Sequence, residues 1–258
     1  MKYELLDLDL EHAAIKVIGI GDAGDLAIKN MRNSTVENVE FHSFSEANIN
    51  PILGRCHLLF LIADMSENGK IADFFSVAEK AKELGILTIS VVTIAPVFDY
   101  IAELTKVSDS LILIPNKPDN IINDMQLNIV RCMSDAVTQQ SIVGFDFADL
   151  KMITKDAGLC AIGIGTAEAE GENREGRAVQ NAISSLLSSN VSIFQQAYGV
   201  LVNISAANMG ISEFDTIGNI VSDLATGDAI IKIVSSFNQS LDDKIKVTIV
   251  ITGVHGII

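Results

Sequence analysis

The 258-residue sequence has no tryptophan, four prolines and three cysteines, and it is poor in basic residues. Lysine and arginine number 18 against 33 acidic residues, which gives a formal net charge of −15 at pH 7. A surface of that sign repels nucleic acids and anionic membranes, so we expect neither as a partner. No apolar run approaches the ~20 residues that a membrane-spanning helix needs. Residues 1–12 are acidic and alternate in hydropathy, unlike a signal peptide, so we expect a cytoplasmic protein.

The residue types that most often bind metals are scattered. Cys56, Cys132 and Cys160 are far apart in apolar surroundings, which in a cytosolic chain indicates buried thiols and no disulfide framework. The histidines show no metal-ligand spacing, and adjacent residues such as Cys56 and His57 point to opposite faces of a strand. We therefore predict no metal site in the protein itself.

Hydrophobic residues make up 48% of the chain, enough for well-filled cores. In the first part, short apolar runs alternate with helical patterns. The predicted strands are Ile15–Ile20, Val39–Phe44, His57–Ala63, Leu87–Val92 and Leu111–Ile114. Helices are predicted after Gly24 and over Ile71–Leu84 and Asp99–Lys106. Strands that alternate with helices predict a parallel sheet with right-handed crossovers.

A long helix is predicted to begin at Asp119, after Pro118, and to end near Gln139. Its apolar residues recur every three or four positions and predict one buried stripe, while polar residues such as Gln126 and Asp135 occupy the other positions. The strands predicted after it are Leu159–Gly165, Gly199–Ala206, Ala229–Phe237 and Ile245–Gly253, and the helices are Glu172–Leu187 and Glu213–Ala225. This order predicts a mixed sheet with helices on one side. We divide the chain into a first domain (1–118), the central helix (119–141) and a second domain (142–258).

A glycine motif, Gly19-x-Gly21-x-x-Gly24, follows the first predicted strand and opens a helix. Glycines there let backbone N–H groups approach phosphates at the helix N-terminus, so the motif is typical of nucleotide-binding domains. Read literally, it is a dinucleotide fingerprint, with Glu46 near the end of the second strand available for a ribose. A short glycine pattern has low specificity, so this reading stays an alternative.

Segments in one consistent order along nearly the whole chain resemble the FtsZ family, the bacterial tubulin-like division proteins. They are IKVIGIGDAGDLAIKNM, FLIADM, AEKAKELGILTISVVT, LILIPN, FDFADLKMI, GLCAIGIG, GENREGRAVQNAISSLL, GVLVNISA and KVTIVITG. The resemblance implies a tubulin/FtsZ-like α/β fold: a parallel-sheet nucleotide-binding domain and a mixed-sheet C-terminal domain, joined by the central helix. It also implies GTP binding and head-to-tail polymerisation, with the nucleotide of one subunit hydrolysed by carboxylates of the next.

The resemblance places a nucleotide site on eight residues: Gly19, Gly21, Asp22, Ala23, Gly24, Asp25, Gly69 and Asn123. Asn123 matches an asparagine that reads guanine in the family, but Asp22, Ala23 and Asp25 stand at other positions of the glycine loop. Carboxylates beside a triphosphate repel it unless magnesium intervenes. The main phosphate loop, Ser66–Ala72, keeps Gly69 and lacks the family's glycine-threonine-glycine run, so its backbone cannot wrap phosphates closely. The chain is also shorter than the family between Phe44 and Arg55 and between Thr93 and Phe98.

The loop after the central helix keeps both family acids, Asp146 and Asp149, which the resemblance implies act catalytically on the nucleotide of a neighbouring subunit. Asp149 has a simpler reading as a helix cap, since Leu150-Lys151-Met152 continues helically. Capping alone does not account for Asp146.

We therefore expect an FtsZ-like cytoskeletal protein that binds GTP or GDP weakly or not at all. It would act through subunit contacts, capping, co-assembling with or regulating a filament. Its partner would be a second copy or another FtsZ-like subunit at the Asp146–Asp149 face. The family's flexible tail, which binds membrane-attached partners, has no counterpart after Ile258. The alternative is a divergent GTPase that polymerises, with magnesium bound only together with nucleotide and held by Asp22 or Asp25.

Overall fold

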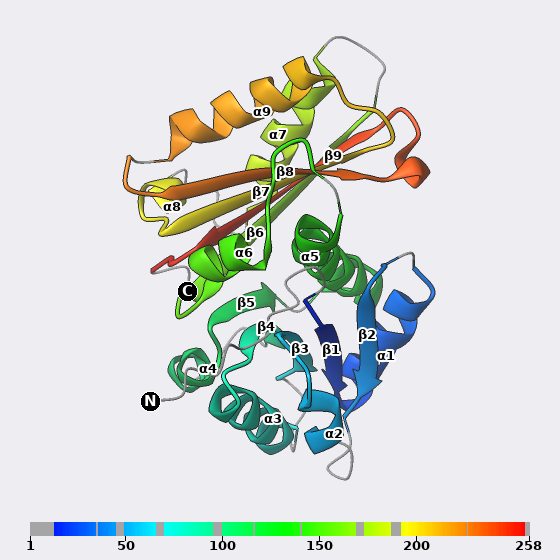
Figure 1. The fold of residues 1–258 in the computed structure, drawn as a ribbon, viewed down its shortest axis with the longest axis vertical. Helices are drawn as coiled ribbons and strands as arrows, with labels where there is room; N and C mark the ends of the chain where they lie inside the picture. Colours follow the sequence, from blue (N-terminus) through cyan, green and yellow to red (C-terminus); the bar gives the residue numbers. More distant parts are fainter. Residues whose placement is uncertain are drawn as a thin grey trace, which may run out of the picture.

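The computed structural model describes residues 13–34, 36–44, 49–65, 70–94, 100–115, 117–139, 141–168, 173–186, 192–225 and 227–255. Two layered halves lie on either side of one long helix, which is seen nearly end-on in the middle of Figure 1. A single nine-stranded sheet runs through both halves in the order β2-β1-β3-β4-β5-β6-β9-β7-β8. No helix among the described residues combines the length and the apolar character that crossing a membrane requires.

The first half is the predicted parallel α/β layer. Its elements are β1 (Ile15–Ile20), α1 (Gly21–Arg32), β2 (Val39–Ser43), α2 (Ile49–Leu53), β3 (Leu58–Asp64), α3 (Ile71–Glu83), β4 (Leu87–Ile94), α4 (Ile101–Val107) and β5 (Ser110–Pro115). All neighbouring strands here pair in parallel. Residues of β1 alternate between two cores: Ile15 and Val17 pack with α1, and Ile18 and Ile20 pack with α2, α3 and α4. The strands β1, β3, β4 and β5 are buried on both faces, which explains their largely apolar sequences, whereas the edge strand β2 is only partly buried.

The second half is the predicted mixed sheet, reached through the central helix α5 (Asp119–Thr138). Its elements are α6 (Phe147–Thr154), β6 (Gly158–Ala167), α7 (Arg174–Ser185), α8 (Ser192–Gln195), β7 (Gly199–Ala206), α9 (Ile211–Leu224), β8 (Ile230–Phe237), η2 (Gln239–Leu241) and β9 (Ile245–Thr252). The last two strands are not neighbours: β9 pairs antiparallel with both β6 and β7, and β8 pairs with β7 on its other side.

Helices cover both faces of this second sheet, so the expectation of helices on one side was incomplete. The core beneath α7 and α9 contains alternate residues of β7 (Val200, Val202), while Leu201 faces the opposite core together with α5. The two halves are also joined directly, because β5 pairs with β6 in parallel over the short stretch Ser110–Ile112 and Gly158–Cys160. The connection between domains is therefore a shared sheet as well as the predicted helix.

The central helix is buried around most of its circumference, and the prediction of one apolar stripe was wrong. Gln126, Ser134 and Asp135 are buried together with the apolar stripe, because both halves pack against the helix. Asn203 on β7 ties it in place by donating a hydrogen bond from Nδ2 to the Cys132 carbonyl at 3.0 Å. All three cysteines are free and buried, as predicted.

The burial of Asp135 predicts a pH-dependent stability. Burial raises the pKa of its carboxyl group to about 6, although Arg131 opposes the shift. Between pH of about 3.9, the pKa of an unfolded aspartate, and pH of about 6, the native state holds a proton that the unfolded state has released. The contribution of Asp135 to stability therefore falls as the pH rises through this range. We expect the free energy of unfolding of Asp135→Asn, relative to wild type, to increase by about 1 kcal/mol between about pH 5 and 7.

Urea unfolding of both proteins at the two pH values measures this difference. Asp124→Asn, an exposed acid on the same helix, is the control. A difference between Asp135→Asn and wild type that does not change with pH would contradict the assignment.

Candidate functional site

A cavity of about 280 Å³ lies at the carboxyl ends of β3 and β4, between the N-terminal turns of α1 and α5. It is lined by Asp22, Ala23, Leu26, Asp64, Thr93, Asp119, Ile122, Asn123 and Gln126. Ligands of open α/β sheets bind outside the carboxyl ends of the strands. This is the place where the sequence predicted the nucleotide site.

The glycine motif above this cavity has a packing explanation. Gly21 has φ +75° and turns the chain from β1 into α1. Gly19 and Gly24 face each other so closely that a Cβ on Gly19 would lie 2.4 Å from the Gly24 carbonyl oxygen. A Cβ on Gly24 would in turn lie 2.8 Å from the Gly19 carbonyl carbon. The three glycines therefore let the strand and the helix meet, whether or not a phosphate binds.

The predicted nucleotide residues are only partly brought together. Asp22, Ala23 and Asn123 line the cavity. Asp25 is exposed and is not part of the lining. Gly69, with most of the predicted main phosphate loop, lies outside the described residues, and so does Glu46.

The described lining of the cavity is acidic. Three carboxylates, Asp22, Asp64 and Asp119, line it, and no lysine or arginine does among the described residues. A triphosphate carries several negative charges, and carboxylates beside it repel it unless a cation intervenes. Sequence reasoning missed Asp64 and Asp119 as site residues, and it used Asp119 only as the start of the central helix. The structure shows no capping bond from a side chain at the start of α5.

Gln126 was also missed, because the sequence pattern placed it on a polar helix face. Its residue is only 3% exposed, and its side chain lines the cavity. Its Oε1 is the one buried side-chain nitrogen or oxygen in the described part of the chain that has no hydrogen-bond partner. Leaving such an atom unsatisfied costs about 1–3 kcal/mol, so its presence requires an explanation.

The two carboxylates after the central helix form a capping box at the start of α6. Asp146 Oδ1 accepts a bond from the Asp149 backbone N–H at 2.9 Å, and Asp149 Oδ2 accepts one from the Asp146 N–H at 3.2 Å. The expectation that capping could not account for Asp146 was therefore wrong, since each acid supports the other.

Asp149 has a further partner that the sequence did not reveal. Lys232 on β8 donates a hydrogen bond from Nζ to Asp149 Oδ1 at 2.7 Å. The hydrogen bond from Lys232 holds the pKa of the Asp149 carboxyl below its usual value despite partial burial. The hydrogen bond from the Asp146 backbone N–H acts in the same direction with a smaller effect. Asp146 is exposed, and the hydrogen bond that its side chain makes is the capping bond from the Asp149 N–H.

The acids and the cavity lie at opposite ends of α5 within one chain. From Asn123 to Thr138 the helix rises roughly 20 Å, and the loop carrying Asp146 follows it. Any joint action of the two sites would need two subunits. No group of three His, Cys, Asp or Glu side chains in the described part of the chain could hold a metal ion.

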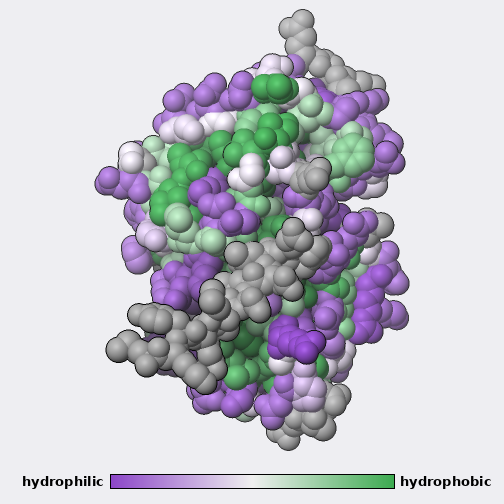
Figure 2. Space-filling view, in the orientation of Figure 1, coloured by the Kyte–Doolittle hydropathy of each residue, from purple (hydrophilic) through white to green (hydrophobic). Residues whose placement is uncertain are grey.

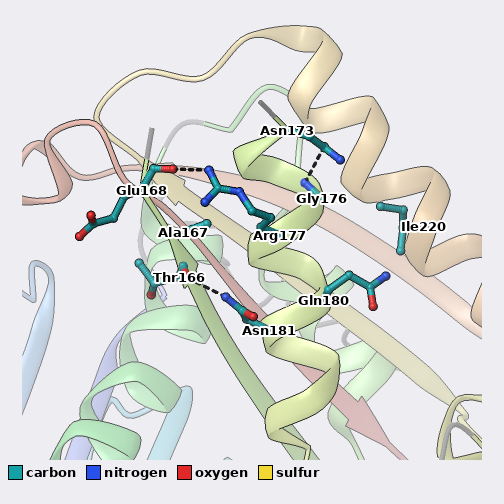
Figure 3. A pocket seen from close by; sticks show the side chains of 9 residues that line it. All are labelled: Thr166, Ala167, Glu168, Asn173, Gly176, Arg177, Gln180, Asn181 and Ile220. Atoms are coloured by element: carbon teal, nitrogen blue, oxygen red, sulfur yellow. Dashed lines mark hydrogen bonds between the residues drawn. The ribbon is translucent and has the colours of Figure 1, made fainter. Parts of the chain in front are cut away.

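A larger hollow of about 630 Å³ lies beside α7, and Figure 3 shows its lining side chains. Arg177 donates to the Glu168 carbonyl oxygen at 2.7 Å, and Asn181 donates to the Thr166 carbonyl oxygen at 3.1 Å. Asn173 caps the helix by accepting from the Gly176 N–H. These bonds hold α7 to the chain around β6, and we assign the hollow no ligand.

The topology and the long helix between the halves define a protein of the tubulin/FtsZ type. The structure is similar to that of an empty FtsZ dimer from M. jannaschii, with a TM-score of 0.82 and 22% identity. That match covers 93% of this chain and 88% of the archaeal one.

Sequence comparison identifies the family. Residues 158–255 match the family model described as FtsZ family, C-terminal domain. The cell division protein FtsZ of Coxiella burnetii is 31% identical, and the match covers 97% of this chain and 81% of that protein. The FtsZ of Buchnera aphidicola from Schizaphis graminum is 29% identical over 94% of this chain and 80% of its own length. The chain belongs to the FtsZ family.

The comparison also shows that this member is shortened. The alignment with the Coxiella protein runs over 317 positions, more than the 258 residues of this chain, so the relative has stretches without a counterpart here.

The pair between Lys232 and Asp149 predicts a second pH effect. A carboxyl group whose pKa is lower in the folded than in the unfolded state stabilises the fold at pH values above its unfolded-state pKa. That stabilisation is lost as the pH falls through its folded-state pKa. We expect Lys232→Met to lower the free energy of unfolding by about 1 kcal/mol near pH 7, and by less below about pH 4. Denaturant unfolding at both pH values checks this.

Lys244→Met is the matched control, because its pair with Glu168 is more exposed and should contribute little. A loss from Lys232→Met of equal size at both pH values would show that the lysine acts through packing and not through Asp149.

Proposed function

We propose that this protein is a cytoskeletal member of the FtsZ family that takes part in cell division through contacts with other FtsZ-type subunits. We propose further that it binds GTP weakly or not at all. The relatives that support the first part are cell division proteins. The dimeric state of the archaeal FtsZ structure supports self-association.

The acidic cavity is the observation that carries the proposal of weak GTP binding. Asp22 takes the place of a family glycine, and with Asp64 and Asp119 it lines the place where phosphates would lie. Of the glycines that remain, Gly19 and Gly24 are required by the packing of β1 on α1, so they are explained without a phosphate. Loss of several charge-assisted hydrogen bonds, each on the order of 1.5–3 kcal/mol, would move a micromolar site to millimolar.

The face carrying Asp146 has the features of a subunit contact. Ile142 and Val143, in the loop before Asp146, are 50% and 49% exposed, and Met152 on α6 is 51% exposed. Exposed apolar residues beside a charge are typical of an interface with an apolar centre and a polar rim. In the view of Figure 2, hydrophobic side chains gather mainly in the upper half, over the C-terminal part of the chain.

The first test is calorimetric titration with GTP and with GDP, each with and without magnesium, after any copurified nucleotide has been identified. We expect no binding tighter than about millimolar, because the lining carboxylates repel the phosphates. Micromolar binding would overturn this part of the proposal. GTP turnover that rises with protein concentration would then establish the alternative, a polymerising GTPase whose acids act between subunits.

The second test separates the charge of Asp146 from its capping role. Asparagine caps helices as well as aspartate, so Asp146→Asn should leave thermal stability nearly unchanged. At the proposed interface it should weaken association about 3- to 10-fold, and Val143→Ser should weaken it further. Self-association by analytical ultracentrifugation and co-sedimentation with a filament-forming FtsZ measure the effect.

Ile211→Ser is the control, since Ile211 is an exposed apolar residue on α9, across the second sheet from α6. Equal association of Asp146→Asn, Val143→Ser and wild type would remove this face from the proposal.

A further inference from the structure

We propose that the acidic segment 1–12, which precedes the described residues, docks on a lysine-lined pocket of its own chain. The pocket has a volume of about 280 Å³. It is lined by the ends of α3 and α4, the start of β4, and the last turns of α6 with the residues after it. The docking itself is independent of the proposed function, and only its effect on subunit association rests on that function.

Three lysines line this pocket, and none of them is neutralised by an acidic side chain. Lys82 comes from α3, Lys151 from α6, and Lys155 directly follows α6. Among the described residues, no carboxylate lies within ion-pair distance of any of the three. Lys82 donates instead to the Lys106 carbonyl oxygen. Cations that share one pocket repel one another, and an anion placed between them removes that repulsion.

The two acids in the lining leave these lysines available. Asp109 is engaged by the backbone, because its Oδ2 accepts from the Thr88 N–H at 2.8 Å and its Oδ1 accepts from the Asp156 N–H at 3.4 Å. Asp156 is exposed, and it forms no ion pair with a lysine of the pocket. The lining therefore keeps an excess of positive charge in a chain whose net charge is −15.

Residues 1–12 have the complementary composition. They include one lysine and four acids, which are Glu4, Asp7, Asp9 and Glu11. Over 6–11 leucines and acids alternate strictly, so in an extended conformation the leucines lie on one side and the carboxylates on the other. Such a segment fits a surface that offers cations and apolar side chains together.

The surroundings of the pocket offer both. Leu84 follows the lysine at the end of α3 and is 52% exposed, and Met152 follows Lys151 on α6 and is 51% exposed. Covering half-exposed apolar side chains with leucines removes apolar area from water, which favours docking. The carboxylates of the same segment can reach the lysines between them.

The place where the segment joins the fold brings it close to the pocket. The Ala14 N–H donates to His57 Nδ1 at 2.9 Å, and the Leu87 N–H, in the pocket lining, donates to the His57 carbonyl at 3.1 Å. Because β3 alone separates β1 from β4, the chain enters β1 about 10 Å from this lining. Four extended residues span about 13 Å, so the acids of the segment reach the lysines without a second chain.

Docking has a consequence for subunit association. Met152 belongs to the face that we propose as a subunit contact, and the docked segment covers it. The segment therefore competes with an incoming subunit and restrains association.

Carbodiimide cross-linking of the whole chain tests the docking, because it joins a carboxylate to a lysine amine in direct contact. We expect mass spectrometry of the monomeric product to show cross-links from acids of residues 4–11 to Lys151 or Lys155. The exposed pair of Lys244 and Glu168, 2.8 Å apart, is the internal control for reactivity.

Two double variants with the same change in charge test the competition. Asp7→Asn with Asp9→Asn should strengthen self-association about 3- to 10-fold, because the released segment exposes the subunit face. Asp215→Asn with Asp223→Asn, at exposed acids on α9, should change it less than about twofold. Sedimentation velocity over a range of protein concentrations measures both.

Absence of cross-links from the segment to the pocket lysines, with the control pair joined, overturns the docking and leaves the proposed function standing. Cross-links found only in a dimeric product place the segment on a second copy and overturn docking within one chain. Equal cross-linking to Lys29, an exposed lysine on α1, is general attraction and also overturns the site.

The remaining outcomes concern association. Cross-links in the monomer, with equal association of the segment variant and wild type, support the docking and overturn the competition at Met152. A protein that associates with no FtsZ-type subunit removes the proposed function, while cross-links in the monomer still establish the docking.

Discussion

The burial of α5 between the two halves of one sheet is the constraint on which the rest of the structure depends. One continuous core contains residues of β1 from the first half, Leu201 and Val250 from the second, and Ile129 and Met133 from the helix between them. Polar contacts such as the bond from Asn203 to the Cys132 carbonyl fix the helix in rotation as well as in position. The cavity and the acidic loop are therefore held at fixed places, the cavity beside the first turns of α5 and the loop beyond its last turn.

The glycine motif beside the cavity shows that residues of a family motif can have a role in packing. The glycines that would admit phosphates are retained, and their close contact gives a reason for retention that does not involve a ligand. Asp22 and Asp25, at other positions of the same loop, are acids. In the same way, Asp146 and Asp149 form a helix cap and an ion pair that stabilise this chain by itself. Residues that match a family motif can thus be explained by stability before function is considered.

The sequence predicted most strands because the inner ones are short apolar runs buried on both faces, and for β7 the predicted bounds agree with the structure. It failed where the environment comes from distant segments. Gln126 and Asp135 look like surface residues because local periodicity cannot show that a second sheet covers the other side of α5. Lys232 could not be paired with Asp149, since they are far apart in sequence. The capping box was readable, because acids three residues apart before an apolar run predict it.

The position of β9 has a consequence for how the chain matures. It is the last strand in the sequence, yet it lies inside the sheet, bonded to β6 on one side and to β7 on the other. During synthesis, β6 and the β7–β8 pair emerge first, each with an open edge that can capture another chain. The second half can close only after β9 has left the ribosome, so the nascent chain carries these open edges until that strand is available.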